Sequence, residues 1–258
     1  MLARLALWVL LVGDDPARVD PDRPTITNTT STVARGAVQI EVGVDAQVYG
    51  RARDDDFLVA TPLIVRIGVH DKVELRVFDG DPVRWAIGQT GARQQHEISL
   101  GAKIQLFERG TTTKVSLGLQ PQLLPVPPRG KATFWAPLPA VVLLFTVEPG
   151  EWNVSVNAGV KTAPADTGRC CEVSNVWAAS VSRSLADRRL RLWGEAYARL
   201  DFPHTELAEL AGDGGVIVNL GRRVALDAGV LVGRARRTLV VAVLAGLSVR
   251  FGGRRSRR

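Results

Sequence analysis

The sequence predicts an all-β protein, a transmembrane antiparallel up-and-down β-barrel of about 12 strands. Three observations support this fold class. Apolar and polar residues alternate in strand-sized segments along most of the chain, which is typical of strands with one buried face. Hydrophobic residues make up 46% of the chain, yet no window holds the roughly 18 apolar residues that a membrane helix needs. The last long segment ends in an aromatic residue, Phe251, almost at the chain end, which fits a barrel-closing strand.

This closing strand is predicted over Thr238–Phe251. Successive side chains of a strand point to opposite faces, so alternate residues share a face. One face is wholly apolar: Leu239, Val241, Val243, Ala245, Leu247, Val249 and Phe251. The opposite row is smaller and ends in Ser248 and Arg250.

Eleven strands are predicted before the closing strand. The first, Gly36–Val48, shows the cleanest alternation, with Val and Ile opposite Gln, Glu and Asp. Phe57–Val69 is less regular and turns sharply into Val73–Phe78, where Val and Leu oppose Glu and Arg. A long loop leads to Ile98–Leu106, which alternates again. Phe134–Val147 is apolar on both faces, so its register stays open. The remaining strands are expected at 114–124, 152–161, 173–184, 190–200, 215–220 and 224–232.

The connections between these strands differ in length at the two rims. Bacterial barrels have short periplasmic turns and longer outer loops. Periplasmic turns are predicted at 70–72, 107–113, 148–151, 185–188 and 221–223, and outer loops at 49–56, 79–96, 125–133, 162–172, 201–213 and 233–237.

The chain divides into four parts around this barrel. Residues 1–13, with one basic residue before an apolar core, predict a signal peptide; a short buried strand is the alternative. Residues 14–35 form a polar periplasmic segment and a candidate plug, residues 36–251 the barrel, and residues 252–258 a basic tail.

Alternation alone does not say whether the apolar row faces lipid or a soluble core. Side chains fill a barrel of about eight strands, whereas one of about twelve lined by Val, Leu and Ala would enclose a void. The apolar row is therefore assigned to lipid and the polar row to a lumen. A soluble β-sandwich or lipocalin-like binding protein is the alternative.

Composition excludes several functions. The net charge of +7 comes largely from the tail arginines and from Gly233–Arg237, which indicates solvated loops and no nucleic-acid partner. The adjacent Cys170 and Cys171 are read as loop residues, because neighbouring cysteines rarely reach disulfide geometry. No metal site and no cofactor are expected.

Charged residues on the polar row are the candidate lumen-lining sites. They are Glu41, Asp45, Arg66, Glu74, Arg76, Lys103, Lys161, Arg191, Glu195, Arg199, Asp227 and Arg250. Such residues either tune the selectivity of a pore or form cross-strand ion pairs that close a narrow barrel. Glu74 and Arg76, adjacent on one face, favour pairing.

Four stretches together resemble the bacterial outer-membrane proteins known as putative transporters of the meta-pathway of phenol degradation. They are DRPTITNT (22–29), VRIGVHDKVELRV (65–77), EISLGAKIQL (97–106) and VSRSLADRRLRLWGEAY (181–197). The resemblance implies a Gram-negative outer-membrane barrel that moves small aromatic or hydrophobic solutes. It also implies contact with outer-membrane lipid and recognition of the strand ending at Phe251 by the barrel-assembly machinery.

Two other functions stay open. A closed structural or adhesion barrel would act through its outer loops and conduct nothing. An outer-membrane lipid hydrolase would need a Ser/His pair, but His96 and Ser99 face opposite sides of a strand entrance, so no catalytic residue is assigned and no enzyme is expected. From the face assignment, arginine should be tolerated at Gln39 and rejected by lipid at Val42.

Overall fold

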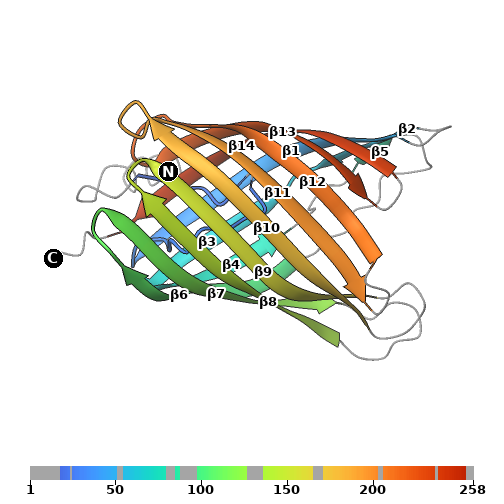
Figure 1. The fold of residues 1–258 in the computed structure, drawn as a ribbon, viewed down its shortest axis with the longest axis horizontal. Helices are drawn as coiled ribbons and strands as arrows, with labels where there is room; N and C mark the ends of the chain where they lie inside the picture. The colour runs from blue at the N-terminus through green and yellow to red at the C-terminus, as the bar shows by residue number, and fades with distance from the viewer. Residues whose placement is uncertain are drawn as a thin grey trace, which may run out of the picture.

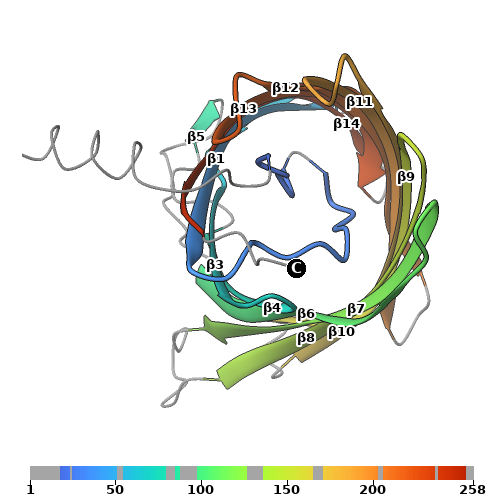
Figure 2. The same ribbon diagram turned by 90° about the vertical axis from the view of Figure 1, so that its left-hand side faces the viewer.

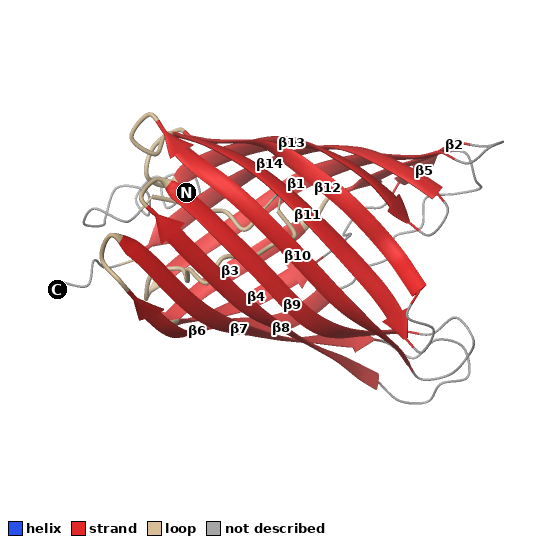
Figure 3. Cartoon of the chain, viewed as in Figure 1, coloured by secondary structure: helices blue, strands red, loops and turns tan. Residues whose placement is uncertain are grey.

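The computed structural model describes residues 18–23, 25–50, 55–79, 85–87, 98–126, 136–164, 171–202, 206–235 and 238–253. Every regular element in these ranges is a strand (Figure 3), and no helix there is long and apolar enough to cross a bilayer. The predicted signal peptide, Cys170, His96 and the arginines of the basic tail lie outside the described residues.

One antiparallel sheet contains all the strands (Figure 1). They are β1 (Ala37–Gly50), β2 (Asp55–Ala60), β3 (Leu63–His70), β4 (Val73–Asp79), β5 (Trp85–Ile87), β6 (Ile98–Arg109), β7 (Thr113–Val126), β8 (Ala136–Pro149), β9 (Trp152–Pro164), β10 (Cys171–Leu185), β11 (Leu190–Phe202), β12 (Glu206–Asn219), β13 (Val224–Ala235) and β14 (Thr238–Gly252).

The sheet closes into a barrel because β14 pairs with β1 from Ala37↔Gly252 to Gly50↔Leu239. β2 and β3 both pair with β1, so together they fill one strand position in the wall. β5 pairs with β2 and β4 pairs with β3, so β4 and β5 together fill the next position. The predicted closed barrel of about twelve strands is confirmed, and Figure 2 shows the ring along its axis.

Several predicted boundaries are wrong for physical reasons. The predicted loop 201–213 is mostly strand, because β12 pairs with β11 across a register shift at Arg199/Leu200. The predicted strand 57–69 is interrupted after Ala60 at Pro62, which lacks the N–H of a regular ladder. The predicted loop 79–96 contains β5.

Tight connections gather at one end of the barrel, here called the short-turn end. They are residues 71–72, 110–112, 150–151, 186–189 and 220–223. The opposite end is called the long-loop end. Apart from Pro24, the internal residues outside the described ranges all belong to connections at this end. β1 begins and β14 ends at the short-turn end.

The outer surface of the wall is apolar. On β14, Val243 is 59% exposed whereas its neighbour Leu244 is 5% exposed, so the predicted apolar row does point outward. Exposed residues of the same kind continue around the wall, among them Val44, Leu75, Leu100, Leu143, Val156, Trp177, Leu192, Leu210 and Val230. A continuous band of this kind suits lipid and not water. The chain therefore forms a bacterial outer-membrane β-barrel.

Arginine on this band should block membrane insertion. Val42 lies near the middle of β1 and is 42% exposed, so Val42→Arg should cost about 2–4 kcal/mol at the bilayer midplane. Ser182→Arg is the matched control, because Ser182 lines a cavity of about 490 Å³ inside the barrel. The yield of outer-membrane protein whose gel mobility shifts on boiling should fall for the first variant only. Equal yields would contradict the orientation of the faces.

Candidate functional site

The N-terminal segment, residues 18–35 apart from Pro24, runs through the interior of the barrel (Figure 2). It begins at the short-turn end, where the backbone N–H of Val19 donates to Arg222 O at 3.0 Å and Arg18 donates to Asp187 O. Its buried residues are Val19, Pro21, Asp22, Arg23, Thr27, Thr30 and Val33. The lumen is thus occupied by the chain's own backbone.

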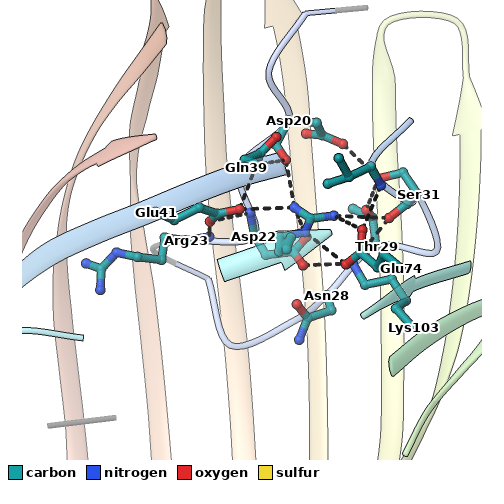
Figure 4. A network of polar contacts seen from close by, with 12 residues as sticks. Asp20, Asp22, Arg23, Asn28, Thr29, Ser31, Gln39, Glu41, Glu74 and Lys103 are labelled. Atoms are coloured by element: carbon teal, nitrogen blue, oxygen red, sulfur yellow. Dashed lines mark hydrogen bonds and ion pairs between the residues drawn. The ribbon is translucent and has the colours of Figure 1, made fainter. Parts of the chain in front are cut away.

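Asp22 lies at the centre of a buried polar network (Figure 4). Its carboxylate is 2.7 Å from Lys103 Nζ, 2.9 Å from Arg76 Nη1 and 3.3 Å from Arg66 Nη1. The three cations belong to β6, β4 and β3. One carboxylate of the N-terminal segment therefore connects three strands of the wall.

The strand register explains why this carboxylate is needed. Arg66 and Arg76 are direct cross-strand partners, and like charges at such positions repel each other. Lys103 is the direct partner of Glu74 on the next strand pair. Because Asp22 contacts both arginines and the lysine, it converts a repulsive arrangement into an attractive one.

Two glutamates complete the network through Arg66. Arg66 Nε and Nη2 donate to the two oxygens of Glu74, each at 2.9 Å, and Nη1 donates to Glu41 Oε1 at 3.1 Å. Such bidentate contacts are the strongest carboxylate–guanidinium pairs. Together with Arg76 and Lys103, the network holds three cations and three carboxylates, and without Asp22 the wall keeps three cations against two carboxylates.

The same glutamates accept hydrogen bonds from the backbone of the N-terminal segment. Glu41 Oε2 accepts from the N–H of Asp22 at 3.0 Å and of Arg23 at 2.9 Å. Glu74 Oε2 accepts from the N–H of Val33 at 2.6 Å. A buried N–H without an acceptor is costly, so these carboxylates replace the strand partner that the segment lacks.

The opposite wall holds the segment in the same way. Glu195 on β11 accepts from the N–H of Ile26 at 2.8 Å and from the N–H of Thr27. Thr146 Oγ1 on β8 accepts from the N–H of Thr30 at 3.2 Å. The N-terminal segment is therefore anchored on both sides of the lumen.

Two further ion pairs extend the network toward the two ends of the barrel. Arg23 Nη2 is 3.0 Å from Asp45 on β1, and Arg191 Nη2 on β11 is 2.6 Å from Asp20. The segment carries both cations and anions and meets the opposite charge on the wall at each site.

Gln39 belongs to this network, which reverses the expectation that arginine would be tolerated there. Its Nε2 donates to Asp20 O at 3.0 Å and to Glu41 Oε1 at 2.7 Å. Its Oε1 accepts from Arg250 Nε and Nη2 at 2.9 and 2.7 Å. An arginine at this position would lose the acceptor and place a second guanidinium against Arg250.

Gly68 on β3 has no side chain, and this leaves space for the backbone of the N-terminal segment. A Cβ at this position would overlap the carbonyl oxygens of Val33 and Ala34 and lie 2.7 Å from the carbonyl carbon of Ala34. These are backbone atoms, so any side chain at Gly68 would displace the segment.

The twelve candidate residues fall into three groups. Eight are buried, three half-buried and one exposed: Glu41, Arg66, Glu74, Arg76, Lys103, Glu195, Asp227 and Arg250; then Asp45, Arg191 and Arg199; and Lys161. Five of the buried residues belong to the network around Asp22: Glu41, Arg66, Glu74, Arg76 and Lys103. Lys161 and Arg199 lie apart, toward the long-loop end. Both oxygens of Asp227 lack a hydrogen-bond partner within the described residues.

Two details of the network differ from the prediction. Glu74 pairs mainly with Arg66, because its contact with Arg76 is 3.9 Å long. The residues that organise the site, Asp20, Asp22 and Arg23, were not among the candidates. The density of Asp, Arg and Thr in this segment was a signal, but strand periodicity does not apply to it.

Toward the middle and the long-loop end, the inside of the barrel holds apolar as well as polar residues. The buried inward-facing residues there include Leu58, Ile64, Leu138, Val142, Leu144, Ala178, Ala211, Val240, Ala242 and Leu244. Much of the inner row of β8 and β14 is apolar, as the outer row is, so on these strands the lumen is not lined by polar residues alone.

Two cavities flank the N-terminal segment. The larger, about 490 Å³, opens at the short-turn end and is lined by Arg18, Asp20, Arg188, Arg191 and other residues. The smaller, next to Thr25, Thr27 and Trp193, holds only about 20 Å³, which is room for about one water. No group of three His, Cys, Asp or Glu in the described ranges could hold a metal ion.

No protein-family model and no curated protein matches this sequence. Among solved structures, the COG4313 outer membrane channel from Pseudomonas putida F1 has a TM-score of 0.61 at 12% identity, over 91% of this chain and 100% of that chain. The KdgM porin in complex with disordered oligogalacturonate has a TM-score of 0.49 at 8% identity, over 82% of this chain and 98% of that one. The similarity to the first of these shows a shared barrel fold.

Removing the central guanidinium should destabilise the barrel. Arg66→Met leaves three buried carboxylates against two cations, which should lower the free energy of unfolding by about 3–5 kcal/mol. Arg199→Met is the control, because the half-exposed Arg199 makes only ion pairs of 3.4 and 3.5 Å, worth about 0–1 kcal/mol. Urea unfolding followed by the heat-modifiable gel band measures both. Losses of equal size would show that the network does not stabilise the barrel.

Proposed function

We propose that the protein is a porin-like channel for small aromatic or hydrophobic compounds and that the N-terminal segment is its plug. The short-turn end faces the periplasm and the long-loop end faces the outside. Membrane lipid surrounds the apolar band, and the assembly machinery reads the strand that ends at Phe251.

The observation that carries this proposal is the charge imbalance of the wall. Arg66, Arg76 and Lys103 lie against only two wall carboxylates, and Asp22 supplies the third. A barrel with a purely structural role would gain more from a balanced or apolar wall, because buried ion pairs are a weak source of stability. The charges of the wall are balanced by a segment that is not part of the wall, and such an arrangement suits a plug.

Apolar residues on part of the inner wall support the choice of solute. Residues such as Leu58, Leu138 and Val240 present apolar side chains on the inside toward the long-loop end. This lining favours apolar solutes over strongly hydrated ones. The resemblance to the putative transporters of the phenol meta-pathway points to the same class.

Releasing the plug should open the channel. Asp22→Ala removes the carboxylate shared by three cations, so planar bilayers with this variant should show stepwise conductance well above that of the parent protein. Thr32→Ala is the control, because Thr32 lies on the same segment but only donates to Asp71 O at 2.9 Å. It should conduct like the parent.

A reversible crosslink ties any conductance to the segment itself. The hydroxyls of Thr30 and Ser116 are 2.5 Å apart, so Thr30→Cys with Ser116→Cys can form a disulfide once Cys170 and Cys171 are replaced by serine. In the Asp22→Ala background, oxidation should abolish conductance and reduction should restore it. A folded, heat-modifiable Asp22→Ala barrel that conducts nothing would favour the closed structural barrel instead.

A further inference from the structure

The larger cavity beside the N-terminal segment is lined by more cations than carboxylates. It holds about 490 Å³ and opens at the short-turn end, which is the end that faces the viewer in Figure 2. The lining cations are Arg18, Arg66, Lys114, Arg188, Arg191 and Arg250, and the lining carboxylates are those of Asp20, Glu148 and Glu151. Small-molecule sites typically hold about 300–1,000 Å³, so the cavity has room for a small organic anion.

Two of the lining cations, Arg18 and Arg188, have no carboxylate partner. Neither forms an ion pair with any residue of the described ranges. Arg18 donates instead to the backbone oxygen of Asp187, which places its guanidinium beside the residue that precedes Arg188. A carbonyl oxygen does not neutralise a guanidinium, so two uncompensated positive charges line the cavity near the β10–β11 turn.

Most other charges of the lining are balanced by their own neighbours. Arg191 is 2.6 Å from Asp20, and Arg66 belongs to the network around Asp22. Lys114 on β7 and Glu148 on β8 are direct cross-strand partners. The surrounding tight turns do not cancel the excess, because they carry Lys72, Arg188, Arg189, Arg222 and Arg223 against Asp71, Glu151 and Asp187.

The β10–β11 turn holds Arg188 in an unusual backbone conformation. Ala186, Asp187 and Arg188 have φ angles of 49°, 53° and 64°, a left-handed conformation that residues other than glycine rarely adopt. Asn219 on β12 supports it, because its Nδ2 donates to Arg188 O at 2.9 Å and its backbone N–H donates to Arg189 O at 2.8 Å. Strained backbone of this kind is concentrated at functional sites. The turn thus fixes the backbone of Arg188 at the cavity.

Hydrogen-bond donors accompany the charges on this side of the cavity. Ser182 and Ser184 on β10 both line it, and Ser184 is the direct cross-strand partner of Arg191. Arg18 donates to Asp187 O through Nη1, and its other guanidinium nitrogens can donate to a ligand. The cavity therefore offers an oxyanion both positive charge and hydrogen-bond donors.

We propose that this cavity binds a small phosphate monoester, with the phosphate group between Arg18 and Arg188 and the organic group in the rest of the cavity. Such a phosphate carries about −1.5 to −2 charges at pH 7 and three acceptor oxygens, which matches two uncompensated guanidinium groups. Arginine binds phosphate through two parallel hydrogen bonds. Inorganic phosphate would leave most of the cavity unfilled, so an ester suits it better. Because Arg18 belongs to the N-terminal segment and Arg188 to the wall, the phosphate would join the two.

Titration calorimetry of the full-length protein in detergent at low salt tests this site. Glucose 6-phosphate should bind at a single saturable site, inorganic phosphate should bind more weakly, and glucose should not bind. Arg18→Gln and Arg188→Gln should each weaken the binding of glucose 6-phosphate about tenfold or more, because the phosphate loses a charge-assisted hydrogen bond.

Arg189→Gln is the matched control. It removes the same charge from the next residue of the same turn, and Arg189 does not line the cavity, so this variant should bind glucose 6-phosphate like the parent protein. Arg188→Lys keeps the charge and should bind more tightly than Arg188→Gln. The heat-modifiable gel band shows that each variant is folded.

Three results would overturn the proposal. Absence of saturable binding would remove the site, and equal weakening by Arg188→Gln and Arg189→Gln would reduce it to the general charge of the rim. Equal affinity for inorganic phosphate and glucose 6-phosphate would exclude an ester as the preferred ligand. The titration needs no open channel, so its failure leaves the proposed channel function, tested by the conductance of Asp22→Ala, unaffected.

Discussion

The structure depends on one buried carboxylate that does not belong to the barrel wall. The register of β3, β4 and β6 brings Arg66, Arg76 and Lys103 together, and the wall alone cannot neutralise them. Burying an uncompensated charge costs several kcal/mol, so the wall requires an anion in the lumen. Asp22 meets that requirement, and the path of the whole N-terminal segment follows from its position.

The lumen is divided by this requirement into two regions. Around the N-terminal segment, charged side chains and backbone N–H groups satisfy one another at Glu41, Glu74 and Glu195. Toward the middle and the long-loop end, apolar residues such as Leu138, Val142 and Val240 share the inner face with polar ones such as Gln120, Asn157 and Arg199.

Periodicity predicted the barrel well because alternation is a local property. The outward row of β14 and the strand count followed from the sequence. The first half of β12 was predicted as a loop, because the centre of this strand, AGDGG, lacks β-branched residues. The polar network around Asp22 could not be predicted from the sequence for another reason. It depends on which residues face each other across β3, β4 and β6, and on where an irregular segment crosses the lumen, and neither is encoded in a period of two.

Polar contacts and buried apolar residues such as Val19 and Val33 both hold the N-terminal segment in the lumen, and the polar contacts depend on one another. Asp22 contacts three cations at once, and the N–H groups on either side of it depend on Glu41, which also binds Arg66. Water that reaches any one of these contacts weakens the others, since ion pairs lose most of their strength in a high dielectric. An arrangement with only half of these contacts would leave buried charges without partners, so the polar contacts favour holding the segment as a unit.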